Sequence, residues 1–124
     1  MRRFMESDHG EIAGWQILRH GLPPPDPKSF PKIGLIEPNL ACGFLYRTDS
    51  DLAMAEGMYT NPEAPLHLRV EAMDRIIDGL LFMAKELGFH RVVATCRRNS
   101  MAQRTARHGF RGLGTYRMVV KELR

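Results

Sequence analysis

The stretch LHLRVEAMDRIIDGLLFMAKELGF, from Leu66 to Phe89, decides the fold, because one apolar stripe runs along its whole length. Apolar residues recur at alternating spacings of four and three, which is the period of one face of an α-helix. The members of the stripe are Leu66, Val70, Met73, Ile77, Leu80, Ala84 and Leu87. Gly88 follows, where a left-handed residue commonly ends a helix. We predict one long helix that packs against a broad apolar surface.

Strand patterns lie on both sides of this helix. Upstream, residues 32–37, 40–48 and 52–60 are apolar runs separated by short turns, which is typical of an antiparallel meander. Downstream, residues 91–96 form a short β-branched run. Because a helix that connects two strands of one sheet usually leaves them parallel, we expect one parallel βαβ crossover.

The remaining segments complete the predicted order of elements. We expect a strand at residues 2–6, a helix at 11–20, a short helix through His108 and a final strand at 113–123. The inward-facing residues of the first helix are predicted to be Ile12, Trp15, Leu18 and Ile17, and those of the last strand Tyr116, Met118 and Val120. Residues 22–31 hold five of the eight prolines and are predicted to form a stiff surface connection, with Phe30 as its anchor.

These patterns predict a single α/β (α+β) domain over residues 1–124. Its mixed, mostly antiparallel sheet has one parallel βαβ crossover, and helices lie on both faces. No run of about 18 apolar residues is present, so we expect no membrane span. The two cysteines, Cys42 and Cys96, lie in apolar runs and are predicted to be small buried residues, which favours a reducing cytoplasm. The five histidines show no metal-ligand spacing, so we predict no metal site.

Charge is distributed unevenly along the chain. Residues 1–65 carry six Lys or Arg and nine Asp or Glu, a net −3, whereas residues 66–124 carry twelve and five, a net +7. The second half therefore predicts a positive surface suited to phosphate or to an acidic partner. Its arginines lack the interleaved aromatic residues that stack on bases, which argues against nucleic acid as the partner.

Three segments of the sequence resemble the GNAT (N-acetyltransferase-related) family. They are YTNP at residues 59–62, KELGFHRVVATC at the end of the long helix, and NSMAQRTARHGFRGLGTY with Asn99, Ala102, Gly109 and Phe110. The resemblance implies the GNAT fold, with acetyl-CoA as the cofactor and an amine as the acyl acceptor. The overall pattern is also similar to small GNAT-like proteins that bacteriophages encode.

The cofactor loop of that family departs from its usual form here. A glycine-rich loop normally lets backbone amides approach the pyrophosphate at the start of the long helix. The family commonly has a proline shortly before this loop, and Pro62 matches it, so the loop falls on residues 65–70. There Pro65 lacks an amide hydrogen, and Leu66, Leu68 and Val70 are apolar residues expected in the core. The resemblance still assigns six residues to the cofactor: Met58, His67, Leu68, Arg69, Asn99 and Arg104.

Glu56 is the predicted general base. It shares one face of its strand with Leu52, Met54 and Met58 by the period of two, so it is an acid in an apolar row. Gly57 beside it favours a β-bulge or a close approach of another backbone. Glu56 could take a proton from an attacking amine, or it could be a carboxylate paired with a neighbouring arginine. Thr105 stands where the family commonly has a tyrosine as general acid.

Two functions therefore remain open at this stage. The first is an acetyl-CoA-dependent N-acyltransferase with an atypical cofactor loop, acting on a small-molecule or protein amine. The second is a non-catalytic GNAT-like interaction domain or a phage virion-associated structural protein, whose partners would be other virion or host proteins. Binding of acetyl-CoA separates the two hypotheses.

Overall fold

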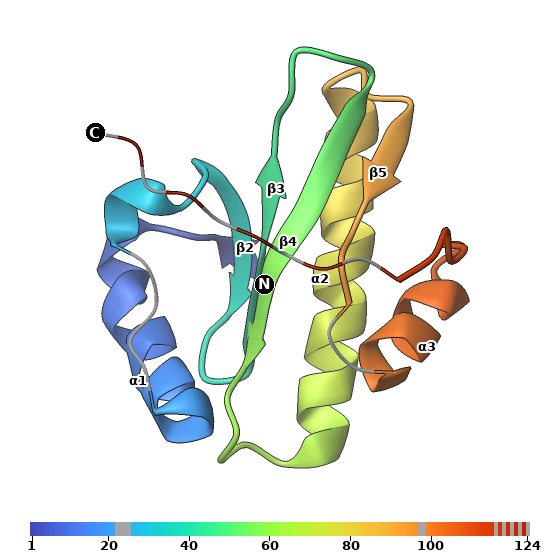
Figure 1. Cartoon of the computed structure of the whole chain (residues 1–124). Coiled ribbons are helices and arrows are strands. Elements are labelled where there is room, and N and C mark those ends of the chain that lie inside the picture. The colour runs from blue at the N-terminus through green and yellow to red at the C-terminus, as the bar shows by residue number, and fades with distance from the viewer. Residues whose placement is uncertain are drawn as a thin grey trace.

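The computed structural model describes residues 1–21, 26–96, 99–115, 117, 119, 121 and 123 (Figure 1). The elements run in the order β1 (Arg2–Arg3), η1 (Glu6–Asp8), α1 (His9–His20), η2 (Pro27–Ser29), β2 (Ile33–Glu37), β3 (Ala41–Tyr46), β4 (Leu52–Thr60), α2 (Leu66–Glu86), β5 (Arg91–Val93) and α3 (Asn99–Arg107). The predicted long helix is confirmed as α2. Gly88 follows it with φ of 88°, the left-handed conformation expected of a residue that ends a helix.

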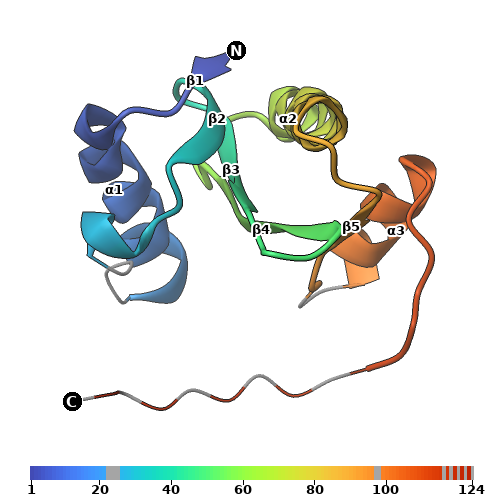
Figure 2. The same cartoon turned by 90° about the horizontal axis from the view of Figure 1, so that it is seen from above.

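The five strands form one sheet in the order β1-β2-β3-β4-β5. Neighbouring strands are antiparallel from β1 to β4, whereas β4 and β5 are parallel and connected by α2. Helices α1 and α2 cover opposite faces of the sheet, and α3 lies beyond β5 (Figure 2). The predicted fold class, a mostly antiparallel mixed sheet with one βαβ crossover, is therefore confirmed.

One core lies between α2 and the sheet. It buries Leu35, Ala41, Leu45, Ala53, Ala55, Ala72, Met73, Ile76, Ile77, Leu80 and Ala84. Each fully buried Ile or Leu of this core contributes about 1.5–3 kcal/mol by removing its side chain from water. The apolar stripe of α2 therefore holds the helix against β2, β3 and β4.

A second core on the opposite face is aromatic. The Phe30 ring is stacked on Phe44, with centroids 4.9 Å apart, and Phe4 meets Phe44 edge to face at 4.8 Å. Ile12 and Trp15 of α1 pack in the same cluster. Phe30 therefore anchors the end of the Pro-rich connection as expected, while residues 22–25 of that connection lie outside the described residues.

Several predictions of burial are wrong. Ile17 and Leu18 are 51% and 60% exposed, because α1 buries only its Ile12, Trp15 and Gln16 face and the other face meets solvent. Leu66 is 65% exposed and Leu68 37%, because the first turn of α2 extends past the end of β4. Cys42 is buried, and burial raises the pKa of its thiol, whereas Cys96 follows β5 on an exposed segment.

Gly57 forms the predicted bulge. The bulge changes the face of β4 on which Met58 lies, which the regular alternation of strand residues did not predict. Cys42 pairs with Tyr59 but Phe44 pairs with Glu56, so β4 has one more residue than β3 at this point. Gly57 has φ of 65°. The extra residue turns Met58 into the α2 core, so Met58 does not share the face of Glu56.

The predicted strand at the C-terminal end is also wrong for the part that the structure describes. Residues 113–115, 117, 119, 121 and 123 have no strand pairing, and Tyr116, Met118 and Val120 lie outside the described residues. Val119 and Leu123 are 90% and 88% exposed. Within the described residues, no helix combines the length and apolarity needed to cross a membrane.

Candidate functional site

The loop that leads into α2 uses most of its amides internally. Asn61 accepts hydrogen bonds from Glu63 N through its side chain, at 3.0 Å, and from Ala64 N through its carbonyl, at 3.2 Å. The Pro65 carbonyl accepts from the amides of residues 68 and 69, both at 3.1 Å. In the described part of the chain, only the amides of residues 66 and 67 at this helix start lack an acceptor. The backbone therefore offers a much smaller anion site than a glycine-rich loop.

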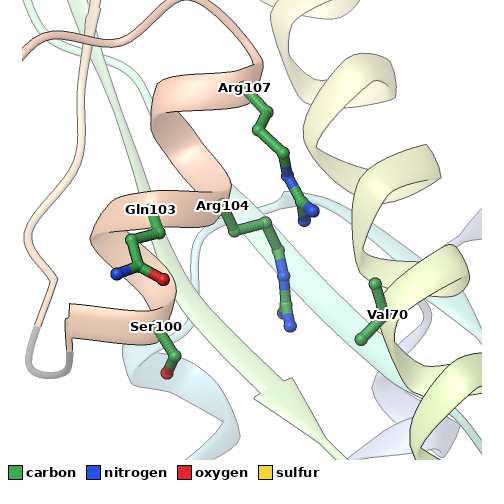
Figure 3. Close-up of a pocket in the computed structure, with 5 residues that line it drawn as sticks. All are labelled: Val70, Ser100, Gln103, Arg104 and Arg107. Carbon is green, nitrogen blue, oxygen red and sulfur yellow. The ribbon is translucent and has the colours of Figure 1, made fainter.

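A pocket of about 430 Å³ lies beside the first half of α2 instead. It is lined by Val70, Ser100, Gln103, Arg104 and Arg107. Figure 3 shows the guanidinium groups of Arg104 and Arg107 extending from α3 toward α2, where Val70 forms the opposite wall. The two arginines lie three residues apart on α3, so both project from the same side of the helix.

Positive charge concentrates at this pocket. The Nε atoms of Arg69 and Arg104 are buried and have no acceptor among the described residues. Burial lowers the pKa of Arg104, and the charges of Arg107 and Arg69 lower it further, against an opposing effect of Asp74. A buried donor without an acceptor costs about 1–3 kcal/mol, and more when it is charged. An anion bound here would reduce the repulsion among the three arginines.

Glu56 lies where β4 and β5 stop pairing. The last parallel pair is Met54 with Val93, and two residues farther along Glu56 meets Thr95. Thr95 N donates to Glu56 Oε1 at 2.9 Å, and the Thr95 hydroxyl lies 3.0 and 2.8 Å from the two carboxylate oxygens. This side-chain contact replaces the ladder and ends β5 at Val93, three residues before the predicted end.

Tyr46 adds a second polar group near Glu56. Burial raises the pKa of the Tyr46 hydroxyl, and the negative charge of Glu56 raises it further. Tyr46 pairs with Met54 across β3 and β4 and is 37% exposed, so solvent reaches this face of the sheet. Among the described residues, the partner of the Glu56 carboxylate is therefore Thr95, with Tyr46 close by, and no arginine of that set is paired with it.

The structure brings together only some of the predicted site residues. Arg104 lines the pocket, and Arg69 acts on Arg104 through its charge without lining the pocket. His67 lies exposed on the first turn of α2. Met58 packs in the core, Glu56 does not line the pocket, and the Asn99 side chain lies outside the described residues. The Thr105 hydroxyl is buried and donates to Ala102 O at 2.9 Å.

The sequence prediction of cofactor residues missed Val70, Ser100, Gln103 and Arg107. The spacing of Arg104 and Arg107 was a usable signal, because residues i and i+3 share a helix face. Which residue of α2 would face them could not be read from the sequence, because it depends on how the two helices dock.

Comparison with known proteins supports the fold. No family model matches the sequence, and no curated protein matches it significantly. The crystal structure of Rv2747 from Mycobacterium tuberculosis, in complex with CoA and NLQ, is 22% identical, with a TM-score of 0.72 over 95% of this chain and 75% of that one.

Two further solved structures are similar over nearly the whole chain. A Trypanosoma brucei acetyltransferase is 13% identical, with a TM-score of 0.64 over 98% of this chain and 97% of that one. An aminoglycoside acetyltransferase from an uncultured soil metagenomic sample, in complex with trehalose, is 13% identical, with a TM-score of 0.58 over 97% and 95%. The chain therefore has the fold of GNAT acetyltransferases.

Proposed function

We propose that this chain binds an acyl-coenzyme A and transfers the acyl group to an amine. The observation that carries the proposal is the pocket between α2 and α3, into which Arg104 and Arg107 extend, with the charge of Arg69 acting on Arg104. Coenzyme A carries three phosphate groups, and arginine binds phosphate through paired charge-assisted hydrogen bonds. Arginine side chains would thus bind the phosphates that backbone amides bind in a glycine-rich loop.

Each part of the site has a distinct role in this proposal. Arg69, Arg104 and Arg107 would hold the phosphates, and the free amides of residues 66 and 67 would add two donors at the positive end of α2. Acetyl-CoA, when bound, supplies a thioester that an amine can attack. Glu56 would accept the proton of that amine, directly or through water, after exchanging its hydrogen bonds with Thr95.

Calorimetry and thermal shift with acetyl-CoA and CoA at millimolar concentration test binding. A ligand that binds the native state raises the apparent stability, so we expect a higher melting temperature. Arg104→Gln should weaken binding about tenfold or more, since hydrogen bonds to charged groups contribute about 1.5–3 kcal/mol. Arg47→Gln, an exposed arginine after β3, is the charge-matched control and should bind like the wild type. Absence of binding to the wild type would refute the proposal.

The role of Glu56 has its own test. Glu56→Gln should lower turnover about 100-fold or more, the usual contribution of a general base, and leave the affinity for acetyl-CoA nearly unchanged. Unchanged turnover, or a loss of affinity in its place, would show that Glu56 is not the base.

One observation favours the rival function, a GNAT-like domain that binds a protein partner without catalysis. Both carboxylate oxygens of Glu56 already accept hydrogen bonds from Thr95, which is the arrangement of a structural carboxylate. Co-elution with a larger assembly, including a virion, together with no binding of acetyl-CoA, would support this second function.

A further inference from the structure

His108 connects α3 to α2. It follows Arg107, the last residue of α3, and its side chain is only 10% exposed. Its Nδ1 lies 2.7 Å from Asp78 Oδ1, and its Nε2 lies 3.0 Å from Asp74 Oδ1. The two aspartates are four residues apart on α2, so they lie one above the other on the same face of that helix. The single imidazole ring of His108 therefore contacts two carboxylates that lie one helical turn apart on α2.

This geometry requires a proton on each ring nitrogen. An ionised carboxylate only accepts hydrogen bonds, and a neutral imidazole has one donor and one acceptor nitrogen. With a neutral ring, one of the two contacts would place a lone pair against a carboxylate. Both contacts are satisfied together only by the doubly protonated, positively charged imidazolium.

The same contacts fix one wall of the candidate pocket. Asp74 Oδ1 also lies 3.7 Å from Arg107 Nη2, so His108 and Arg107 share one carboxylate. Asp74 acts electrostatically on Arg104 as well. Val70, which lines the pocket, precedes Asp74 by one turn of α2. Met101 and Phe110 also pack against the α2 core, and the link through His108 adds a polar connection between α2 and α3 next to the pocket arginines.

We propose that His108 is a positioning residue: its imidazolium docks α3 on α2, orients Arg104 and Arg107, and makes the affinity of the pocket for an acyl-CoA depend on pH. The affinity part rests on the function proposed above. The docking part concerns the two helices alone and can be tested without a ligand.

The direction of the pH dependence follows from the environment of His108. Burial alone would lower its pKa, but the hydrogen bonds to Asp74 and Asp78 and their charges outweigh burial and raise the pKa above its usual value. Docking is therefore strongest below the ordinary histidine pKa of about 6.5 and is lost as the pH rises through the raised value.

Other charged groups around the ring keep their charge over the useful range. Asp74 and Asp78 face the ring from α2, and Arg104 and Arg107 come from α3. Carboxylates and guanidinium groups do not change charge between pH 7 and about 9.5. The phosphomonoester of CoA titrates near pH 6, so measurements from pH 7 upward leave the ligand phosphates constant.

Calorimetry with acetyl-CoA between pH 7 and about 9.5 tests the affinity part. We expect wild-type affinity to fall about tenfold across this range, the equivalent of one pKa unit. His108→Gln should bind more weakly at pH 7 and lose most of the pH dependence. His108→Lys, which keeps a positive charge across most of the range, should recover binding at pH 7 with a flatter profile. His20→Gln, an exposed histidine of α1, should follow the wild type.

Hydrogen exchange of the α3 amides and the ¹⁵N shifts of the His108 ring test docking without ligand. We expect imidazolium shifts at pH 7, and α3 protection that decreases at high pH in the wild type but is low throughout in His108→Gln. A neutral ring at pH 7, or equal protection in both proteins, would overturn the proposal. If acetyl-CoA does not bind, the function fails and the ring and exchange data still decide the role of His108.

Discussion

At the scale of single residues, Gly57 has the most constrained backbone of the candidate site. Its φ of 65° is a conformation that side chains of L-residues rarely adopt, and a Cβ atom built there would lie 2.9 Å from Phe44 Cδ2. Both conditions favour glycine. The bulge at Gly57 lets Met58 reach the core while Glu56 stays on the open face of the sheet, so the placement of the proposed base depends on it.

Gly57→Ala is therefore expected to destabilise the protein by about 1–3 kcal/mol, from backbone strain and the close approach to Phe44. Gly14→Ala is the matched control, because Gly14 lies inside α1 and a Cβ atom there would meet no neighbouring side chain within 4 Å. That substitution should stabilise by about 0.5–1 kcal/mol, the ordinary preference of a helix for alanine. Urea unfolding measures both, and a Gly57→Ala protein as stable as the wild type would contradict the strained geometry.

The sequence predicted some of these residue contacts and not others. A glycine after an acid in a strand indicated the bulge, but the partner of Glu56 could not be read from the chain. Thr95 lies on a different strand, and its position depends on the register of the parallel pair, Met54 with Val93. Register is set by long-range packing, which local patterns do not carry.

At the scale of elements, the two sides of α2 differ in how much they contribute to the stability of the fold. Ile76 is fully buried against the sheet, where its Cγ2 would lie 2.8 Å from a Cβ atom on Gly43, so helix and strand approach closely there. Phe82, on the same helix, is 64% exposed. Because a substitution acts mainly through the contacts that it removes, these two apolar residues should differ greatly in their effect.

Ile76→Ala should lower the free energy of unfolding by about 2–5 kcal/mol, through lost burial and the cavity left behind. Phe82→Ala should change it by no more than about 0.5 kcal/mol, as an exposed substitution. Chemical denaturation of the two variants gives the comparison. A large decrease in the free energy of unfolding for Phe82→Ala would mean that a partner covers this side of α2 in solution.

Prediction of the elements succeeded where the pattern was long. The stripe of α2 extends over several turns, so chance matches are improbable, and its core face was correctly identified from Met73 to Ala84. Its ends were not, because Val70 lines the pocket and Leu66 and Leu87 are exposed. The shorter α1 has apolar residues at 12, 15, 17 and 18, which do not define one face, and the sequence assigned Leu18 inward while the structure buries Gln16.

At the scale of the whole molecule, the described residues of the C-terminal tail contribute little packing. Val119→Asp and Leu123→Asp should each leave the free energy of unfolding within about 0.5 kcal/mol of the wild type, since these side chains are 90% and 88% exposed. Val92→Ala, in the α2 core, serves as the destabilising comparison. A clear fall in melting temperature for either tail variant, above all together with a change in oligomeric state, would contradict the exposed tail.

The overall architecture was predictable because strand and helix patterns alternate in a limited number of ways. Three consecutive strand signals followed by a helix and one further strand leave few topologies, and the right-handed crossover leaves fewer. The pocket between α2 and α3 was not predictable in the same way. Its two helices are linked by contacts of His108 with Asp78 and Asp74, which lie 30 and 34 residues earlier in the chain and form no motif with it.

The parallel pair of β4 and β5 also has a consequence for how the chain folds. Leu52 pairs with Arg91, so this contact must close a loop of residues 53–90, whereas β2, β3 and β4 are joined by short turns. Local contacts form faster than distant ones, so the meander should assemble first and β5 dock late. Until then the outer edge of β4 has unpaired backbone groups, and such edges associate between chains. We therefore expect refolding yield to fall as protein concentration rises.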